Sequence, residues 1–206
     1  NNTTGEVLAV GGEARRMLGR TPGNITDIKP MKSGVIADFD VTEAMLKYFI
    51  SSAYPKSMFG PKPRVVISVP VGVTEVEKRA FYDLVHMANV KEKKIMFVEK
   101  PIADAVGLGL DVNSAKGIMV VDIGADTTEI SVISLGGIVL SKLLQIGGNH
   151  FNEAILLAIK KQENLLIGRK TAEMIKKKLV SEEGESEGSV KVFGRDIVTG
   201  LPMNRE

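Results

Sequence analysis

The residues best suited to chemistry lie in the segment Val120–Glu129, with the sequence VVDIGADTTE. A run of strand-forming residues ends at Asp122, passes through Gly124 and restarts at Thr127, which predicts a tight hairpin with an acid at its tip. Backbone N–H groups and small hydroxyls gathered in such a turn suit a bound phosphate, and the Asp122 carboxylate can face a hydrated Mg²⁺. An ordinary hairpin with a polar tip would have the same local sequence, so both interpretations stay open at this point.

The composition limits the class of protein. The chain has 206 residues and a net charge of +2, so no polyanion partner is implied and nucleic-acid binding has no support. It has no cysteine, which excludes disulfides and thiolate metal sites and agrees with a reducing cytoplasm. His86 and His150 lie far apart and are expected at the surface or in packing. We expect no signal peptide at the start of this chain, and no segment approaches the roughly 20 apolar residues of a membrane span.

Alternating strands and helices must position the hairpin. We expect strands at 6–10, 64–70 and 94–99, and the strand at 64–70 is apolar enough for a sheet covered on both faces. This α/β pattern predicts a parallel component, to which the hairpin adds antiparallel strands. The expected helices are a short one at 13–18, one begun by Asp40 with Glu43 completing a capping box, one from Thr74 to Ala88 opened by a second box with Glu77, and a short one with Lys100 as its N-cap. The apolar face expected for the helix after Thr74 consists of Val76, Ala80, Phe81, Leu84, Val85 and Ala88.

A helical unit is expected to follow the hairpin. A turn is expected at Gly136–Gly137, followed by a strand at 138–146 that ends at Gly147–Gly148. A domain boundary is expected near Gly147. Helices are predicted at 150–162 and 169–179, and short strands at 190–193 and 196–199 around Gly194. The apolar face expected for the first of these helices consists of Phe151, Ala154, Ile155, Ala158 and Ile159.

Eight segments together resemble the MreB family of bacterial actin homologues, in that family's order and spacing. They are GRTPGNI at 19–25, KPM at 29–31, GVIADFDVTEAML at 34–46, KPRVVISVP at 62–70, GVTEVEKRA at 72–80, VVDIGADTTE at 120–129, VISLGGIV at 132–139 and TGLP at 199–202. The resemblance implies an actin-like (ribonuclease H-like) two-lobe ATPase fold of the α/β class, incomplete in this chain. Residues 1–146 would form most of the first lobe, with a small subdomain at about 1–59 and the sheet and helices at about 60–146. Residues 147–206 would begin the second lobe, with part of its small subdomain at about 181–206.

The resemblance also implies a function. We expect a cytoskeletal subunit involved in cell shape, with ATP and Mg²⁺ as cofactors, self-association into antiparallel paired protofilaments, and a cytoplasmic location at the inner face of the membrane. A membrane-anchored protein of the rod complex is a further partner that the resemblance suggests. The matched nucleotide-binding positions are Asp122, Gly124, Ala125, Asp126, Thr127, Thr128, Gly147, Gly148, Asn149, Glu173 and Lys176, with Asp122 facing the metal through water. For Glu173 and Lys176 a solvated ion pair one helical turn apart is the alternative.

Three departures from the family pattern concern catalysis. Lys100 stands where actin-fold ATPases usually carry Glu or Gln; an ammonium has donors only, so it cannot polarise an attacking water and would instead favour bound ATP. Glu99 should point to the other face and is a poor substitute. Ala125–Asp126 replaces Gly-Gly, and Asn149 replaces Asp. We therefore expect a divergent paralogue with weak or lost ATP hydrolysis, an ATPase at most weakly active.

Two surfaces are expected to make contacts in the filament. Met58 and Phe59 lie between basic residues in a loop that suits an anionic bilayer, although they could also pack on their own subdomain. On the outer side of the helix after Thr74, residues Glu75, Lys78, Arg79, Tyr82 and His86 mix both charges around an aromatic ring, which suits a contact with itself across a two-fold axis. A solvated helix face has the same pattern. The rival function is an actin-superfamily ATPase or kinase, such as a chaperone or sugar kinase, which would need a competent base and long substrate insertions.

Overall fold

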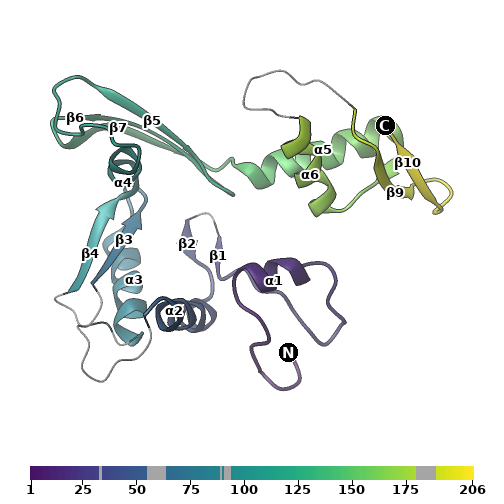
Figure 1. Cartoon of the computed structure of the whole chain (residues 1–206), viewed down its shortest axis with the longest axis horizontal. Helices are drawn as coiled ribbons and strands as arrows, with labels where there is room; N and C mark the ends of the chain where they lie inside the picture. Colours follow the sequence, from purple (N-terminus) through teal and green to yellow (C-terminus); the bar gives the residue numbers. More distant parts are fainter. Residues whose placement is uncertain (33, 55–63, 89, 91–93, 180–188) are drawn as a thin grey trace. The chain divides into compact units, whose positions relative to one another are not determined.

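The computed structural model describes residues 1–32, 34–54, 64–88, 90, 94–179 and 189–206 (Figure 1). The chain divides into two compact units, one made of residues 1–122 and 129–142 and the other of residues 123–128 and 143–206. None of the helices in these described ranges is long and apolar enough to cross a membrane.

The first unit contains a parallel strand pair with a helical crossover. Strands β3 (Val65–Val69) and β4 (Ile95–Glu99) pair in parallel from Val65 opposite Ile95 to Val69 opposite Glu99, which confirms the predicted parallel component. The other elements before the hairpin are α1 (Gly12–Met17), β1 (Met31–Lys32), β2 (Val35–Ile36), α2 (Phe39–Ala53), α3 (Glu75–Met87) and α4 (Lys100–Gly107). The predicted strand at 6–10 is wrong, because this segment pairs with no strand among the described residues and stays largely exposed.

Helix caps follow the prediction in α3 and depart from it in α2. The Thr74 hydroxyl accepts from Glu77 N–H at 3.2 Å, and Thr74 N–H donates to the Glu77 carboxylate at 2.8 Å, so the capping box is confirmed. In α2 the N-cap is Asp38, whose carboxylate accepts from Val41 N–H at 3.0 Å. Asp40 therefore lies inside the first turn; either aspartate is a good cap, and local sequence does not distinguish them.

Two predicted burial patterns in this unit are wrong. Val76 is 80% exposed although Leu84 and Val85, on the expected apolar face of α3, are buried. Val66 and Met96, which are paired across β3 and β4, are 61% and 62% exposed. A near-continuous apolar sequence predicts cover on both faces. In the described residues one face of the pair is uncovered at these two positions.

A three-stranded sheet carries the hairpin. Its strand order is β5 (Ile118–Ile123), β6 (Thr128–Ser134) and β7 (Gly137–Leu144), close to the prediction. The β6–β7 turn has positive φ at both Leu135 and Gly136, the geometry that matches the twist of a two-residue hairpin. Within the first unit, Ala105 of α4 packs with Val120 and Ile133. This cluster fixes α4 against the sheet.

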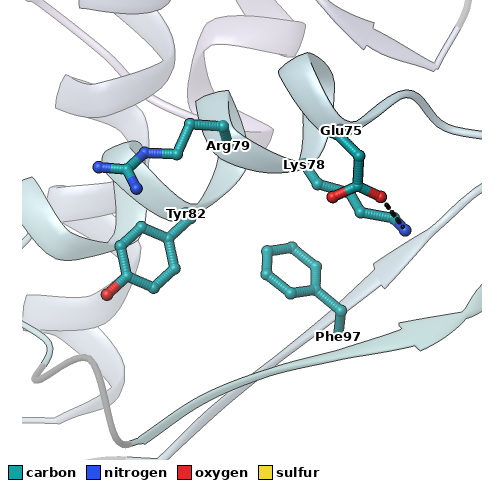
Figure 2. A pocket seen from close by; sticks show the side chains of 5 residues that line it. All are labelled: Glu75, Lys78, Arg79, Tyr82 and Phe97. Atoms are coloured by element: carbon teal, nitrogen blue, oxygen red, sulfur yellow. Dashed lines mark hydrogen bonds and ion pairs between the residues drawn. The ribbon is translucent and has the colours of Figure 1, made fainter.

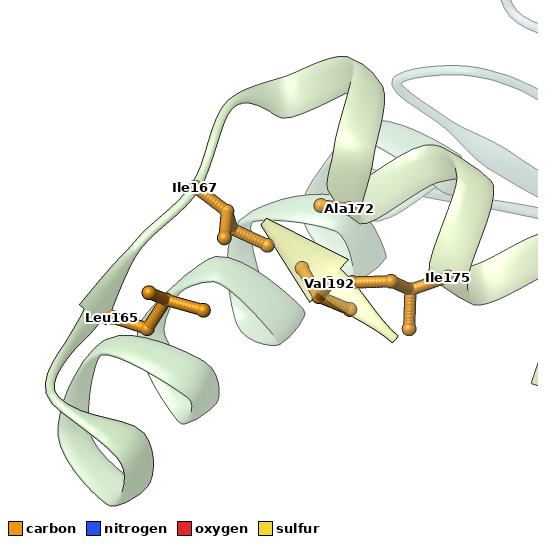
Figure 3. Close-up of a cluster of buried hydrophobic side chains, with 5 residues drawn as sticks. All are labelled: Leu165, Ile167, Ala172, Ile175 and Val192. Carbon is orange, nitrogen blue, oxygen red and sulfur yellow. The ribbon is translucent and has the colours of Figure 1, made fainter. Parts of the chain in front are cut away.

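The second unit is built around one apolar cluster, made of Leu165, Ile167, Ala172, Ile175 and Val192 (Figure 3). Its elements are α5 (Gly148–Glu163), β8 (Leu165–Leu166), α6 (Arg169–Leu179), β9 (Val192–Asp196) and β10 (Pro202–Arg205), with the antiparallel order β10-β9-β8. The bounds of α6 match the prediction. The expected face of α5 is wrong in part: Ile155, Leu156 and Ile159 pack on the cluster, whereas Phe151 is exposed.

The strands predicted around Gly194 are also wrong. β9 continues through Gly194 without a turn. A Cβ at that position would lie 2.5 Å from the Leu166 carbonyl oxygen of the neighbouring strand. The glycine is therefore needed for close packing and makes no turn. Residues 197–200 form the turn, in which the Asp196 carboxylate accepts from Val198 and Thr199 N–H, each at 2.8 Å. These hydrogen bonds lower the pKa of Asp196. The strand that follows the turn is β10.

Candidate nucleotide site

In the second unit, the tip of the β5–β6 hairpin is bonded to the start of α5. Gly148 N–H donates to the Gly124 carbonyl at 2.9 Å, and Asn149 N–H donates to the Ala125 carbonyl at 2.7 Å. The Thr128 hydroxyl donates to the Ile146 carbonyl at 2.7 Å. The structure thus brings together residues 124–128 and 147–149, which are about 20 positions apart in the sequence.

Gly147 makes this approach possible. A Cβ at position 147 would lie 2.8 Å from the Ala125 backbone and from the Gly124 carbonyl oxygen, closer than a side chain tolerates. Gly147 N–H donates to His150 Nδ1 at 3.1 Å, so His150 caps the first turn of α5. This role of His150 was not predicted; the signal for it was a side-chain acceptor three residues after the glycine, as in a capping box.

Lys176 of α6 also reaches these loops. Its ammonium donates to the Gly148 carbonyl at 2.9 Å. Glu173, one turn earlier, pairs with Lys177 at 2.9 Å. Lys176 therefore lies at the loops that the sequence analysis assigned to the nucleotide.

Two polar residues that depart from the family pattern, Asp126 at the hairpin tip and Asn149 at the start of α5, contact each other. Asn149 Nδ2 donates to Asp126 Oδ1 at 2.6 Å, so Asp126 and Asn149, predicted as separate departures, form one hydrogen-bonded pair. The carboxylate at 126 thus has a neutral donor opposite it. With an acid at 149, as in the family pattern, two like charges would meet at this place.

In the first unit, Lys100 forms an ion pair with Asp122. The Lys100 ammonium contacts Asp122 Oδ2, and the two side chains are 33% and 27% exposed. Lys100 is the first residue of α4 and Glu99 is its N-cap, one position from the prediction. Asp104, one turn further along α4, has a buried Oδ2 atom without a hydrogen-bond partner among the described residues. Burial and the Asp122 charge raise the pKa of Asp104, and Lys100 partly offsets them.

The outer face of α3 is charged and internally paired. Lys78 pairs with Glu75 at 3.0 Å, and Arg79 pairs with Asp83 at 2.9 Å and lies 5.3 Å from the centre of the Tyr82 ring. Figure 2 shows Glu75, Lys78, Arg79 and Tyr82 of α3, together with Phe97 of β4, lining one open pocket. The ring of Tyr82 stacks on His86 with centroids 6.2 Å apart. Met58 and Phe59, the predicted membrane residues, lie outside the described residues.

Comparison with known proteins decides the family. The profile of the MreB/Mbl protein family matches residues 1–206. The chain belongs to the MreB/Mbl family. It is 48% identical to the cell shape-determining protein MreB of Escherichia coli K12 over 95% of this chain, and 46% identical to Mbl of Bacillus subtilis 168 over 98%. It spans 56% and 60% of those two relatives.

A solved MreB structure has the same fold. MreB5 of Spiroplasma citri bound to AMPPNP superposes on this chain with a TM-score of 0.89 and 35% identity, over 100% of this chain and 61% of MreB5. A MamK double helical filament matches with a TM-score of 0.72 and 25% identity, covering 96% of this chain and 58% of MamK. The predicted actin-like fold is confirmed.

The loops of this MreB/Mbl chain fit an anion better than a divalent metal. No described residue accepts from the backbone N–H groups of Ala125 and Thr127, and the Lys176 ammonium lies beside Gly148 in the same unit. Such groups suit phosphate oxygens. Asp122, the expected partner of hydrated Mg²⁺, instead carries Lys100 on its Oδ2 atom. The described residues also contain no group of three or more metal-ligating side chains. A hydrated Mg²⁺ at Asp122 would have to compete with the Lys100 ammonium for that carboxylate.

The Asp126–Asn149 pair yields a stability prediction. Asn149→Asp should lower the free energy of unfolding by about 1 to 3 kcal/mol, because it replaces the donor of a partly buried hydrogen bond with a second carboxylate. The exchange variant Asp126→Asn with Asn149→Asp restores one donor and one acceptor and should recover most of that loss. Denaturant unfolding of the full-length protein at neutral pH measures both variants. Equal losses in the single and exchange variants would contradict the pairing.

Proposed function

We propose that the full-length protein is an actin-like cytoskeletal subunit that binds ATP, assembles into filaments at the inner face of the membrane, and serves in cell shape. Its hydrolysis of ATP is weak or lost. The observation that carries the proposal is the pair of backbone-bonded loops at 124–128 and 147–149 with Lys176 beside them. The relatives support it: they are named cell shape-determining proteins, MreB5 was solved with AMPPNP, and MamK was solved as a filament.

The loops and Lys176 hold the nucleotide in this proposal. The Ala125 and Thr127 amides and the Thr127 hydroxyl donate to phosphate oxygens, and Gly124, Gly147 and Gly148 keep the backbone close enough to do so. Glu173 and Lys176 lie on the ribose side of the site, as the family resemblance implies. The negative charge of Asp126 would repel the phosphates, but one of its carboxylate oxygens accepts a hydrogen bond from Asn149.

The hydrolysis rate depends on residue 100. Lys100→Glu should raise phosphate release from ATP by about tenfold or more, because a positioned carboxylate can orient and polarise the attacking water. Lys100→Met removes the ammonium without adding a base and should leave the rate low. Steady-state phosphate release from the full-length protein distinguishes the two variants. A parent protein that already hydrolyses ATP as fast as relatives with Glu at this position would refute the proposal of lost turnover.

Filament pairing uses the outer face of α3. Two copies related by a two-fold axis can place Glu75 of one opposite Lys78 or Arg79 of the other, as the family resemblance implies for antiparallel protofilaments. Electron microscopy with ATP should show paired straight filaments. Lys78→Glu with Arg79→Glu should give single protofilaments or none.

A matched variant separates pairing from helix stability, because those reversals also break two ion pairs within α3. The fourfold variant Glu75→Lys, Lys78→Glu, Arg79→Glu, Asp83→Arg restores both ion pairs and again presents complementary charges to a second copy of itself. It should recover pairing. If the unmodified protein stays monomeric in every condition, the cytoskeletal function is refuted. The alternative is then an ATPase or kinase of the actin superfamily.

Membrane attachment is proposed for Met58 and Phe59. Two apolar side chains each contribute about 1.5 to 3 kcal/mol when fully buried, so a filament that presents many copies should bind where a monomer does not. The double variant Met58→Ser, Phe59→Ser should remain in the supernatant when filaments are sedimented with vesicles of anionic lipid. Unchanged sedimentation of that variant would exclude Met58 and Phe59 as the anchor.

A further inference from the structure

We propose that the carboxylate at the Asp126–Asn149 contact sets the nucleotide preference of the second unit's loops, because it weakens binding of a nucleoside triphosphate more than binding of a diphosphate. The inference rests on the proposed nucleotide binding and concerns how that site distinguishes the two ligands. It uses residues of the second unit alone. The observation that carries it is the hydrogen bond from Asn149 Nδ2 to Asp126 Oδ1, at 2.6 Å.

The carboxylate belongs to the same turn as the proposed phosphate donors. Asp126 lies between Ala125 and Thr127, the two residues whose amides are proposed to donate to phosphate oxygens. Its side chain starts from the backbone that joins those amides, so its charge lies close to any phosphate that they bind. Backbone N–H groups attract phosphate oxygens, whereas a carboxylate repels them. Position 126 therefore opposes the binding that its two neighbours favour.

Asn149 restrains this carboxylate. An aspartate at the tip of an exposed turn can rotate away from a bound anion, but Asp126 is half-buried and bonded to the Asn149 side chain. The Asn149 N–H also donates to the Ala125 carbonyl at 2.7 Å, so the start of α5 holds the tip through both its backbone and its side chain. The amide of Asn149 is neutral. The hydrogen bond thus fixes the position of the carboxylate and leaves its charge.

The charge of the ligand then decides the preference. Lys176 brings a cation to the same loops through its 2.9 Å hydrogen bond to the Gly148 carbonyl, and Asp126 adds an anion. A triphosphate carries one more negative charge than a diphosphate, so the carboxylate repels it more strongly. Two unit charges about 6 Å apart, at an effective dielectric constant of about 40, change a dissociation constant by about tenfold.

The test measures the dissociation constants of ADP and AMPPNP for the full-length protein by calorimetry, with the same Mg²⁺ concentration throughout. Asp126→Asn removes the charge and keeps an oxygen that can accept from Asn149. The ratio of the AMPPNP constant to the ADP constant should therefore fall by about threefold to tenfold relative to the parent. This fall should be smaller at high salt, because salt screens the repulsion.

Two variants serve as matched controls. The exchange variant Asp126→Asn with Asn149→Asp keeps one carboxylate at the contact and should keep the ratio of the parent. Glu163→Gln removes a carboxylate at the other end of α5, about 22 Å along the helix from Gly148, and should also leave the ratio unchanged. Circular dichroism and the melting temperature of each variant verify that it is folded.

The outcomes separate this inference from the proposed function. If Asp126→Asn binds both ligands with the ratio of the parent, the inference is overturned and nucleotide binding stands. A fall in the ratio that is equally large at low and high salt, or that the exchange variant shows as well, also overturns it, because the cause is then not the charge at the contact. A parent protein that binds neither ADP nor AMPPNP refutes the proposed nucleotide binding, and the inference with it.

Discussion

The backbone contact between Gly124–Ala125 and Gly148–Asn149 is the constraint on which the second unit's candidate site depends. Two N–H groups at the start of α5 donate to two carbonyls at the hairpin tip, at 2.9 and 2.7 Å. Only a residue without a Cβ permits this approach at position 147. Once the loops are joined, side chains from both, Asp126 and Asn149, lie in contact. Lys176 then closes on the Gly148 carbonyl from α6.

A comparable constraint in the first unit is the buried carboxylate of Glu129. The side chain is only 3% exposed, and Oε1 accepts from Val71 N–H at 2.9 Å and from the Ser141 hydroxyl at 3.4 Å. A buried carboxylate is costly unless its lone pairs are satisfied. Its bond to Val71 ties the loop after β3 to the sheet that carries Asp122. Loop, sheet and ion pair are therefore held by polar contacts as well as by the apolar cluster of α4.

Local sequence predicted the elements and failed where two local solutions compete. Thr74 and Glu77 specify their capping box at a spacing of three residues, so the box was predictable. Asp38 and Asp40 are both competent caps, and only the fold selects between them. Gly194 has the sequence signature of a turn, but its lack of a side chain serves strand packing. The residues of the two loops were named as candidates for phosphate binding from their resemblance to the family pattern. The Lys100–Asp122 and Asp126–Asn149 contacts were not predicted, because they join residues more than 20 positions apart and have no local signature.

Those two contacts suggest that this chain keeps the family's backbone and redistributes its charge. Where the family pattern has Glu or Gln, Gly and Asp, this chain has Lys100, Asp126 and Asn149. Each of these side chains contacts a partner: Lys100 contacts Asp122, and Asp126 and Asn149 contact each other. A lone replacement would leave an unpaired charge at partly buried positions, which is strongly unfavourable. Reverting Asn149 alone would place two acids at its contact with Asp126. Asp126 and Asn149 are therefore best understood as one coupled pair of departures, whereas Lys100 contacts Asp122, a residue that the family pattern keeps.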